Sequence, residues 1–115
     1  MTTNQKPIGK TTIALDVLVS IAQLTTLSVE GVSRLTAVPR DVNTLFKKGM
    51  HDGVNISVED DRVYVDPYVI LKRDVNVREV ARTIQHQVSR SISEMVGMDI
   101  GRINVHIEDI DFETV

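Results

Sequence analysis

The chain has 115 residues, of which 42% are hydrophobic and 25% are charged, and it carries a net charge of −3 and no cysteine. That length is typical of one domain with its own core. The lack of cysteine excludes disulfides, thiolate nucleophiles and cysteine-ligated metals, and the negative charge argues against a polycation that binds nucleic acid. No apolar run approaches the ~20 residues that span a bilayer, and residues 1–12 are too polar for a signal peptide, which predicts a cytoplasmic domain.

The first predicted elements are an N-terminal tail and an unusually apolar helix. Residues 1–8 are polar and are expected to be flexible, and residues 11–15 predict a short strand or an extended lead-in. Asp16 is placed to cap a helix over residues 17–27. Apolar residues lie nearly all around this helix, and the narrow polar stripe that interrupts them consists of Ser20, Gln23 and Thr26.

A helix this apolar must be covered on more than one side. One interpretation is that it is buried between a sheet and another part of the same chain. The other is that one flank contacts a second copy or a partner protein. Both interpretations remain open at the level of the sequence.

A turn and a short helix are predicted next. Residues 29–32 form the turn, in which Gly31 supplies the backbone freedom that other residues lack. Residues 40–48 predict a short helix with apolar residues facing inward, and Gly49 ends it.

The clearest prediction is a β-hairpin. Residues 54–58 alternate between apolar and polar, which is the period of a half-buried strand, and Asp60–Asp61 makes the turn. The second strand runs over residues 62–72. Because Pro67 has no N–H to donate, we expect an edge position or a bulge there.

A long helix and a last strand complete the chain. Asn76 is placed to cap the helix, with Glu79 completing a capping box and Gly97 ending the helix. Its apolar face consists of Val77, Val80, Ala81, Ile84, Val88, Ile92 and Met95. The last strand, residues 102–108, buries alternate residues, and a bulge or turn near Asp109 should reset its register.

These elements predict an α/β (α+β) fold in the order α-β-β-α-β, with a small mixed sheet backed by two helices. We expect a flexible N-terminus over residues 1–8, a single domain over 9–112 and a C-terminal tail over 113–115. The connection from the hairpin through the long helix to the last strand is a crossover, which is expected to be right-handed if its two strands lie parallel in one sheet.

The polar residues do not form a recognisable catalytic or metal site. Gly9-Lys10-Thr11 lacks the first glycine and the preceding strand of a phosphate-binding loop. No two of His51, His86 and His106 have metal-ligand spacing, and His106 is expected to be a solvated strand residue. We therefore predict no enzymatic activity, no cofactor, no metal and no small-molecule substrate.

One alternative concerns RNA. The loop from Gly49 to Gly53 has two glycines, as do the phosphate-clamping loops of KH domains, and the order of elements is compatible with a KH-like fold. The loop has one residue too many between its glycines and contains Asp52, so a structural turn is the better interpretation. A KH-like RNA-binding module remains the alternative.

Two surfaces are candidate partner-binding sites. Like charges recur every four residues along the long helix and form a basic stripe, which is either a solvated face or a docking surface for an acidic partner. The acidic segment 108–113 of another copy is a complementary surface. The second surface is the outward side of strand 62–72, where tyrosines are plausible contact residues. The candidate residues are Arg78, Arg82, His86 and Arg90 on the stripe, and Tyr64, Tyr68 and Ile70 on the strand.

An ordered series of fragments resembles the alkaline-shock-protein family, also called the Gls-type general or envelope stress proteins of bacteria. The series covers nearly the whole chain from residue 8 to residue 112. Its fragments are Gly9 with Ile13, Val19–Ala22, Val29–Val32, Gly53–Val58, Val63–Asp66, Val77–Ala81, Ile84–Val88, Glu94–Gly97 and Ile103–Ile107. Where members of the family usually have a Tyr-Gly-like turn, this chain has Leu71-Lys-Arg-Asp74.

The resemblance implies a small cytoplasmic domain without catalytic residues. It implies a role in cell-envelope or alkaline stress tolerance, through self-association or through docking to a membrane-anchored protein at the inner face of the membrane. We therefore predict an assembly or scaffold domain whose partner is a protein, itself included, and not a nucleic acid.

Overall fold

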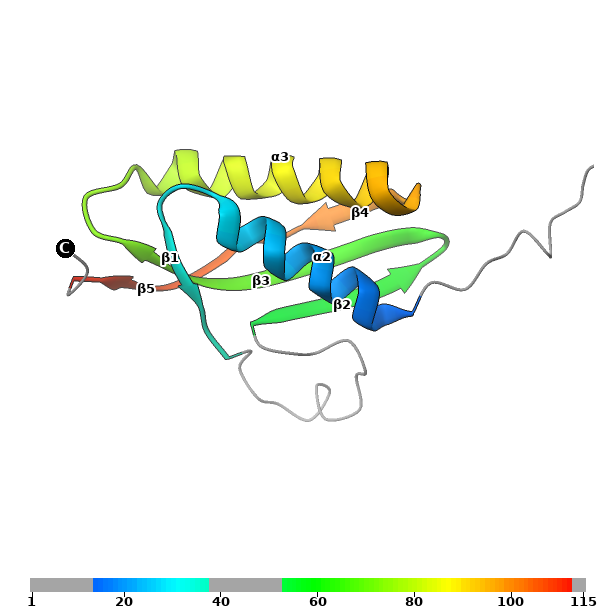
Figure 1. The fold of residues 1–115 in the computed structure, drawn as a ribbon, viewed down its shortest axis with the longest axis horizontal. Helices are drawn as coiled ribbons and strands as arrows, with labels where there is room; N and C mark the ends of the chain where they lie inside the picture. The colour runs from blue at the N-terminus through cyan, green and yellow to red at the C-terminus, as the bar shows by residue number, and fades with distance from the viewer. Residues whose placement is uncertain (1–13, 38–52, 113–115) are drawn as a thin grey trace, which may run out of the picture.

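The computed structural model describes residues 14–37 and 53–112 (Figure 1). The predicted tails, the helix at 40–48 and most of the two-glycine loop lie outside these ranges. The described elements form one domain in which two helices pack on a five-stranded mixed sheet. They are α2 (Leu15–Ser28), β1 (Val32–Leu35), β2 (Val54–Glu59), β3 (Arg62–Lys72), α3 (Val77–Val96), β4 (Asp99–Ile103) and β5 (His106–Asp111).

Strand β3 is the axis of the sheet. It pairs antiparallel with β1 and β2, and parallel with β4 and β5. Strands β3 and β4, which α3 connects, pair in parallel, which is the arrangement that the predicted crossover requires. The predicted fold class, one small domain with a mixed sheet and two helices, is also confirmed.

The expectation that Pro67 lies at an edge or in a bulge is wrong, because β3 has partners on both sides. The β2 register ends where Val54 pairs with Pro67, and the β1 register begins two residues later, at Val69. On the other side, β4 pairs as far as Val65, and β5 starts at Tyr68. Pro67 therefore lies where β3 changes partners on both sides, and a missing N–H costs little at such a break.

Two features of the strand order differ from the prediction, so the described order is α-β-β-β-α-β-β. Strand β1 was not predicted, because it has four residues and Ser33 is an extra residue in its register, which hides the alternation. The predicted last strand is divided into β4 and β5 at residues 104–105. The predicted reset near Asp109 is confirmed, since Glu108 is skipped between the pairs made by Ile107 and Asp109.

The residues predicted to begin and end α3 are correct, whereas the residue predicted to cap α2 is not. The side chain of Asn76 accepts a hydrogen bond from the Glu79 N–H at 3.1 Å, as a capping residue should. Gly97 ends α3 with a left-handed φ of 71°. The predicted cap of α2 is wrong: Ala14 occupies the N-cap without a side-chain hydrogen bond, and Asp16 lies in the first turn.

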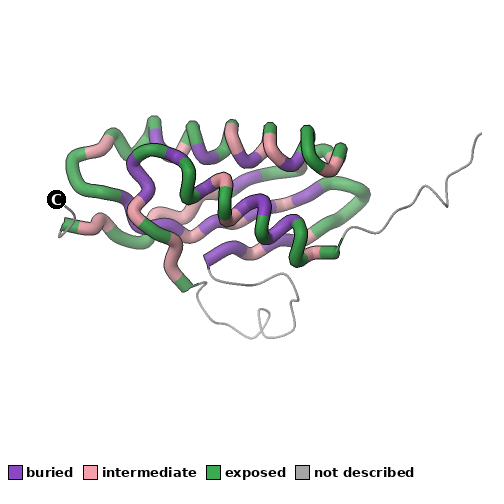
Figure 2. Tube along the Cα trace, in the orientation of Figure 1, coloured by how far each residue is buried: buried purple, intermediate pink, exposed green. Residues whose placement is uncertain are grey.

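The core lies between the sheet and the inner faces of both helices (Figure 2). The two ends of α3 depart from the predicted apolar face. Val77 is 42% exposed and Met95 is 69% exposed, because each lies in a terminal turn of the helix. Within the described residues, no helix is long and apolar enough to cross a membrane. Fully buried residues of the core include Leu18, Ala22, Ile56, Val63, Val65, Val69, Leu71, Ile84, Val88 and Ile92.

Candidate functional site

The described part of the chain offers little for catalysis. No three His, Asp or Glu side chains within it gather at a distance suited to a metal ion. A polar hollow of about 310 Å³ between α3 and the sheet is lined by Arg62, Ser89, Ser93, Asp99 and Ile100. This lining has hydroxyls but no histidine that could serve as a general base for them.

The outward face of the sheet carries a connected polar and aromatic cluster. Tyr64, Asp66 and Tyr68 alternate along β3 on the side opposite the core and are half-buried. The His106 ring stacks on the Tyr68 ring, with the ring centroids 4.3 Å apart and 7° between the planes. His106 Nε2 lies 3.0 Å from Asp66 Oδ1. His106 was expected to be a solvated strand residue. Its side chain is 37% exposed but also contacts Tyr68 and Asp66, because the parallel register of β5 sets it beside Tyr68.

The ring of Tyr64 lies directly over Gly101 of β4. A Cβ atom at Gly101 would come within 2.4 Å of the ring Cζ atom. Gly101 is the extra residue in the β3–β4 register, between the pairs that Ile100 and Arg102 form. The missing side chain thus lets the aromatic ring contact the backbone of the neighbouring strand. The two tyrosines lie on the outward face as the parity of β3 predicted.

Ile70 shares this face but is only 8% exposed, so the expectation that it is available as a contact residue is wrong. Arg34 pairs with Ile70 in the β1–β3 register. Arg34 Nη1 lies 2.8 Å from Asp111 Oδ2, and Ser33 Oγ donates to the same oxygen at 2.9 Å. This tie joins β1 to β5 across the strand that carries Ile70. It also engages Asp111 within its own chain, so the acidic segment is less available to another copy than the sequence suggested.

The basic stripe exists as predicted along the solvent side of α3. Its four residues are exposed, and Arg90 Nε forms an ion pair with Glu94 Oε2 at 3.0 Å. Among the described residues, Glu79 forms no ion pair with Arg82, the stripe residue three positions along the helix. The remaining stripe residues, Arg78, Arg82 and His86, likewise form no ion pair within the described ranges.

The sequence left open whether one flank of α2 contacts a partner, and it did not identify which flank is exposed. Thr26, which was expected in the polar stripe, is fully buried, while Val17, Leu24 and Leu27 are 47%, 70% and 45% exposed. The sheet and α3 cover the other sides of this helix. The exposed positions 17, 20, 24 and 27 recur at intervals of three, four and three residues. Leu15, Leu18 and Ala22 of the same helix share the first two of these intervals, so the spacing alone does not identify the exposed flank.

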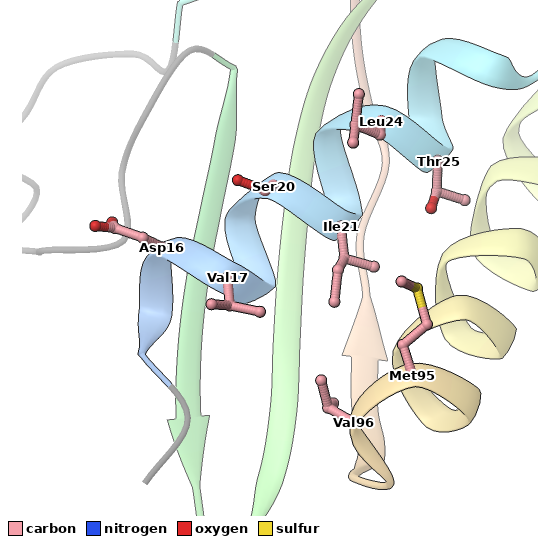
Figure 3. A pocket seen from close by; sticks show the side chains of 8 residues that line it. All are labelled: Asp16, Val17, Ser20, Ile21, Leu24, Thr25, Met95 and Val96. Carbon is pink, nitrogen blue, oxygen red and sulfur yellow. The ribbon is translucent and has the colours of Figure 1, made fainter.

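A groove of about 490 Å³ runs between this flank and the end of α3 (Figure 3). In Figure 3, Val17 and Ile21 extend from α2 toward the end of α3 that carries Met95 and Val96, while Leu24 projects on the other side of the α2 ribbon in this view. Asp16 is the charged residue of its lining. An exposed apolar surface of this kind is typical of a protein–protein contact.

Comparison with known proteins identifies the family to which this chain is similar. Residues 3–112 match the model of the alkaline shock protein 23 family, described as having a cell envelope-related function. No solved structure gives a significant match.

Uncharacterized relatives occur in two bacteria. The protein YqhY of Bacillus subtilis is 30% identical over 109 residues, which is 93% of this chain and 81% of that protein. The B. subtilis protein YloU is 23% identical over 57% of this chain and 55% of its own length. The Streptococcus pyogenes protein Spy1614 is 25% identical over 71% of this chain and 69% of its own.

Proposed function

The chain belongs to the alkaline shock protein family, whose function is related to the cell envelope, and from this premise we propose that it acts as a non-enzymatic assembly domain. It works by self-association or by docking to a membrane-anchored protein, in the response of a bacterium to envelope or alkaline stress. The observation that carries the proposal is the uncovered apolar flank of α2. Leu24 and Met95 are 70% and 69% exposed, and both line a groove whose walls are mostly apolar.

Two further surfaces support a protein partner. The outward face of the sheet presents the two tyrosines, and aromatic residues are enriched at interfaces between proteins. The basic stripe on α3 suits an acidic protein surface, since the net charge of −3 does not favour a phosphate backbone.

The test of self-association is light scattering over a concentration series, at neutral and alkaline pH. We expect a mass that rises above that of one chain as the concentration increases. A strict monomer throughout would refute self-association and leave docking to a different protein.

The stripe is tested by charge reversal. In the double variant Arg82→Glu/Arg90→Glu, we expect weaker association at low salt, and added salt should reduce the difference from the wild type. A double variant that associates like the wild type at low salt would remove the stripe from the proposal.

Filter binding with mixed single-stranded RNA separates this proposal from the KH-like alternative. We expect no retention above that of an acidic control protein. Tight retention that weakens with salt would favour RNA binding instead.

A further inference from the structure

The exposed side chains of α2 form a regular seam. Val17, Ser20, Leu24 and Leu27 are all exposed, and they follow one another at intervals of three, four and three residues. This is the spacing at which side chains of one helix insert between those of another in a coiled coil. In a helix of 3.6 residues per turn, the four positions lie on one side over about 15 Å of helix. We propose that this seam pairs with the same seam of a second copy, with the two α2 helices antiparallel about a two-fold axis near residue 22.

The seam is complementary to itself in this register. An antiparallel pair centred on residue 22 sets Ser20 opposite Leu24 of the second copy, and Val17 opposite Leu27. A small side chain then faces a large one at the centre, which is the alternation that lets two apolar layers interdigitate. A parallel pair in register would instead set Leu24 against Leu24 and leave two serines facing each other.

Charge also favours the antiparallel register. Asp16 is the acidic residue of α2, and the helix contains no lysine or arginine. In a parallel pair the two Asp16 carboxylates would lie at the same end of the paired helices, where like charges repel. In the antiparallel pair the two carboxylates lie at opposite ends of the paired helices.

The end of α3 extends the contact. Met95 lines the same groove as Val17 and Leu24 and is 69% exposed. The flexible, polarizable side chain of methionine adapts to an irregular apolar surface. Met95 would therefore contact the edge of the interface between the two α2 helices. This inference rests on the self-association proposed above and specifies the surface that performs it.

The first experiment compares two exposed apolar residues on helices. We expect Leu24→Glu to raise the dissociation constant of the self-associated form by about tenfold or more, because two carboxylates would be buried at the centre of the seam. Val77→Glu, on α3 at 42% exposure, is the matched control and should change that constant by less than about twofold. Circular dichroism and thermal unfolding check that both variants fold.

The second experiment measures the register by cross-linking. The chain has no cysteine, so single introduced thiols report unambiguously. Ser20→Cys and Leu24→Cys are prepared separately, one with a mass tag, and are oxidised alone and as a mixture. We expect the disulfide between positions 20 and 24 to form in the mixture faster than disulfides between identical variants, because only opposed positions bring Cβ atoms within disulfide distance.

The outcomes distinguish the inference from the proposal on which it rests. If the chain self-associates and Leu24→Glu does not weaken it, the α2 seam is wrong and self-association stands. If identical variants cross-link as fast as the mixture, the antiparallel register is wrong. If the wild type stays monomeric at about 1 mM, where even a weak association of roughly −4 kcal/mol would be detected, both the seam and self-association are refuted.

Discussion

The imidazole of His106 lies flat against the ring of Tyr68, with 4.3 Å between the ring centroids, and its Nε2 atom reaches Asp66 at 3.0 Å. This relationship joins β5 to β3 on the outward face of the sheet, next to the point where β3 changes partners at Pro67. The His106 side chain thus contributes both a stacked ring and a hydrogen bond to the short pairing between β3 and β5.

We predict that His106→Ala lowers the free energy of unfolding by about 1–2 kcal/mol, because the stacked contact and the hydrogen bond are lost together. The side chain is 37% exposed, which keeps the loss in that range. Urea denaturation measures it. His106→Phe retains a ring over Tyr68 and should lose less than His106→Ala; equal losses would contradict a stacking contribution.

Gly101→Ala should destabilise the domain by about 1–3 kcal/mol, because the new methyl group meets the Tyr64 ring and forces it off the strand. The double variant Gly101→Ala/Tyr64→Ala tests the cause. If the ring is the obstacle, the two losses measured by chemical denaturation are not additive, and the double variant is more stable than their sum predicts. Additive losses would point to a cause other than the ring.

Thr26→Val should stabilise the domain by about 1 kcal/mol. Thr26 is fully buried, and its hydroxyl has no hydrogen-bond partner among the described residues, so removing the hydroxyl relieves a desolvation cost while keeping the shape of the side chain. The thermal midpoint and the urea midpoint should both rise. Thr83→Val, at an exposed threonine on α3, is the control and should shift the stability by less than about 0.5 kcal/mol. A fall in stability for Thr26→Val would refute the assignment.

Asn76→Ala should cost about 1 kcal/mol of stability, because the Glu79 N–H loses its acceptor at the start of α3. Asn76→Asp supplies an equivalent acceptor and should retain wild-type stability. The two variants are compared by urea denaturation. Equal unfolding midpoints for both would show that the capping bond contributes nothing measurable.

Local signals predicted much of the fold. The strands β2 and β3 and the turn at Asp60–Asp61 follow from alternation and turn chemistry, and both turn residues have positive φ, at 52° and 64°. The ends of α3 follow from Asn76 and Gly97. These features depend on residues within a few positions of one another, which is the range that a sequence pattern describes.

The candidate surfaces were predictable only in part. The parity of β3 placed Tyr64 and Tyr68 on the outward face, and the four-residue spacing placed the stripe on the solvent side of α3. The burial of Ile70 was not predictable, because Arg34 and Asp111 are 77 positions apart in the chain and meet only across β3. The same holds for His106, since its position beside Tyr68 depends on the register of two parallel strands.

By itself, the sequence determined one domain, no cysteine chemistry, the hairpin, both ends of α3 and the resemblance to a family that the comparisons then confirmed. Only the tertiary structure decided which side of α2 faces solvent. That helix is apolar nearly all round, so its own periodicity does not distinguish one flank from another. Packing against the sheet and α3 buries Thr26 and leaves Leu24 exposed, because burial is set by what lies against a side chain and not by its own polarity.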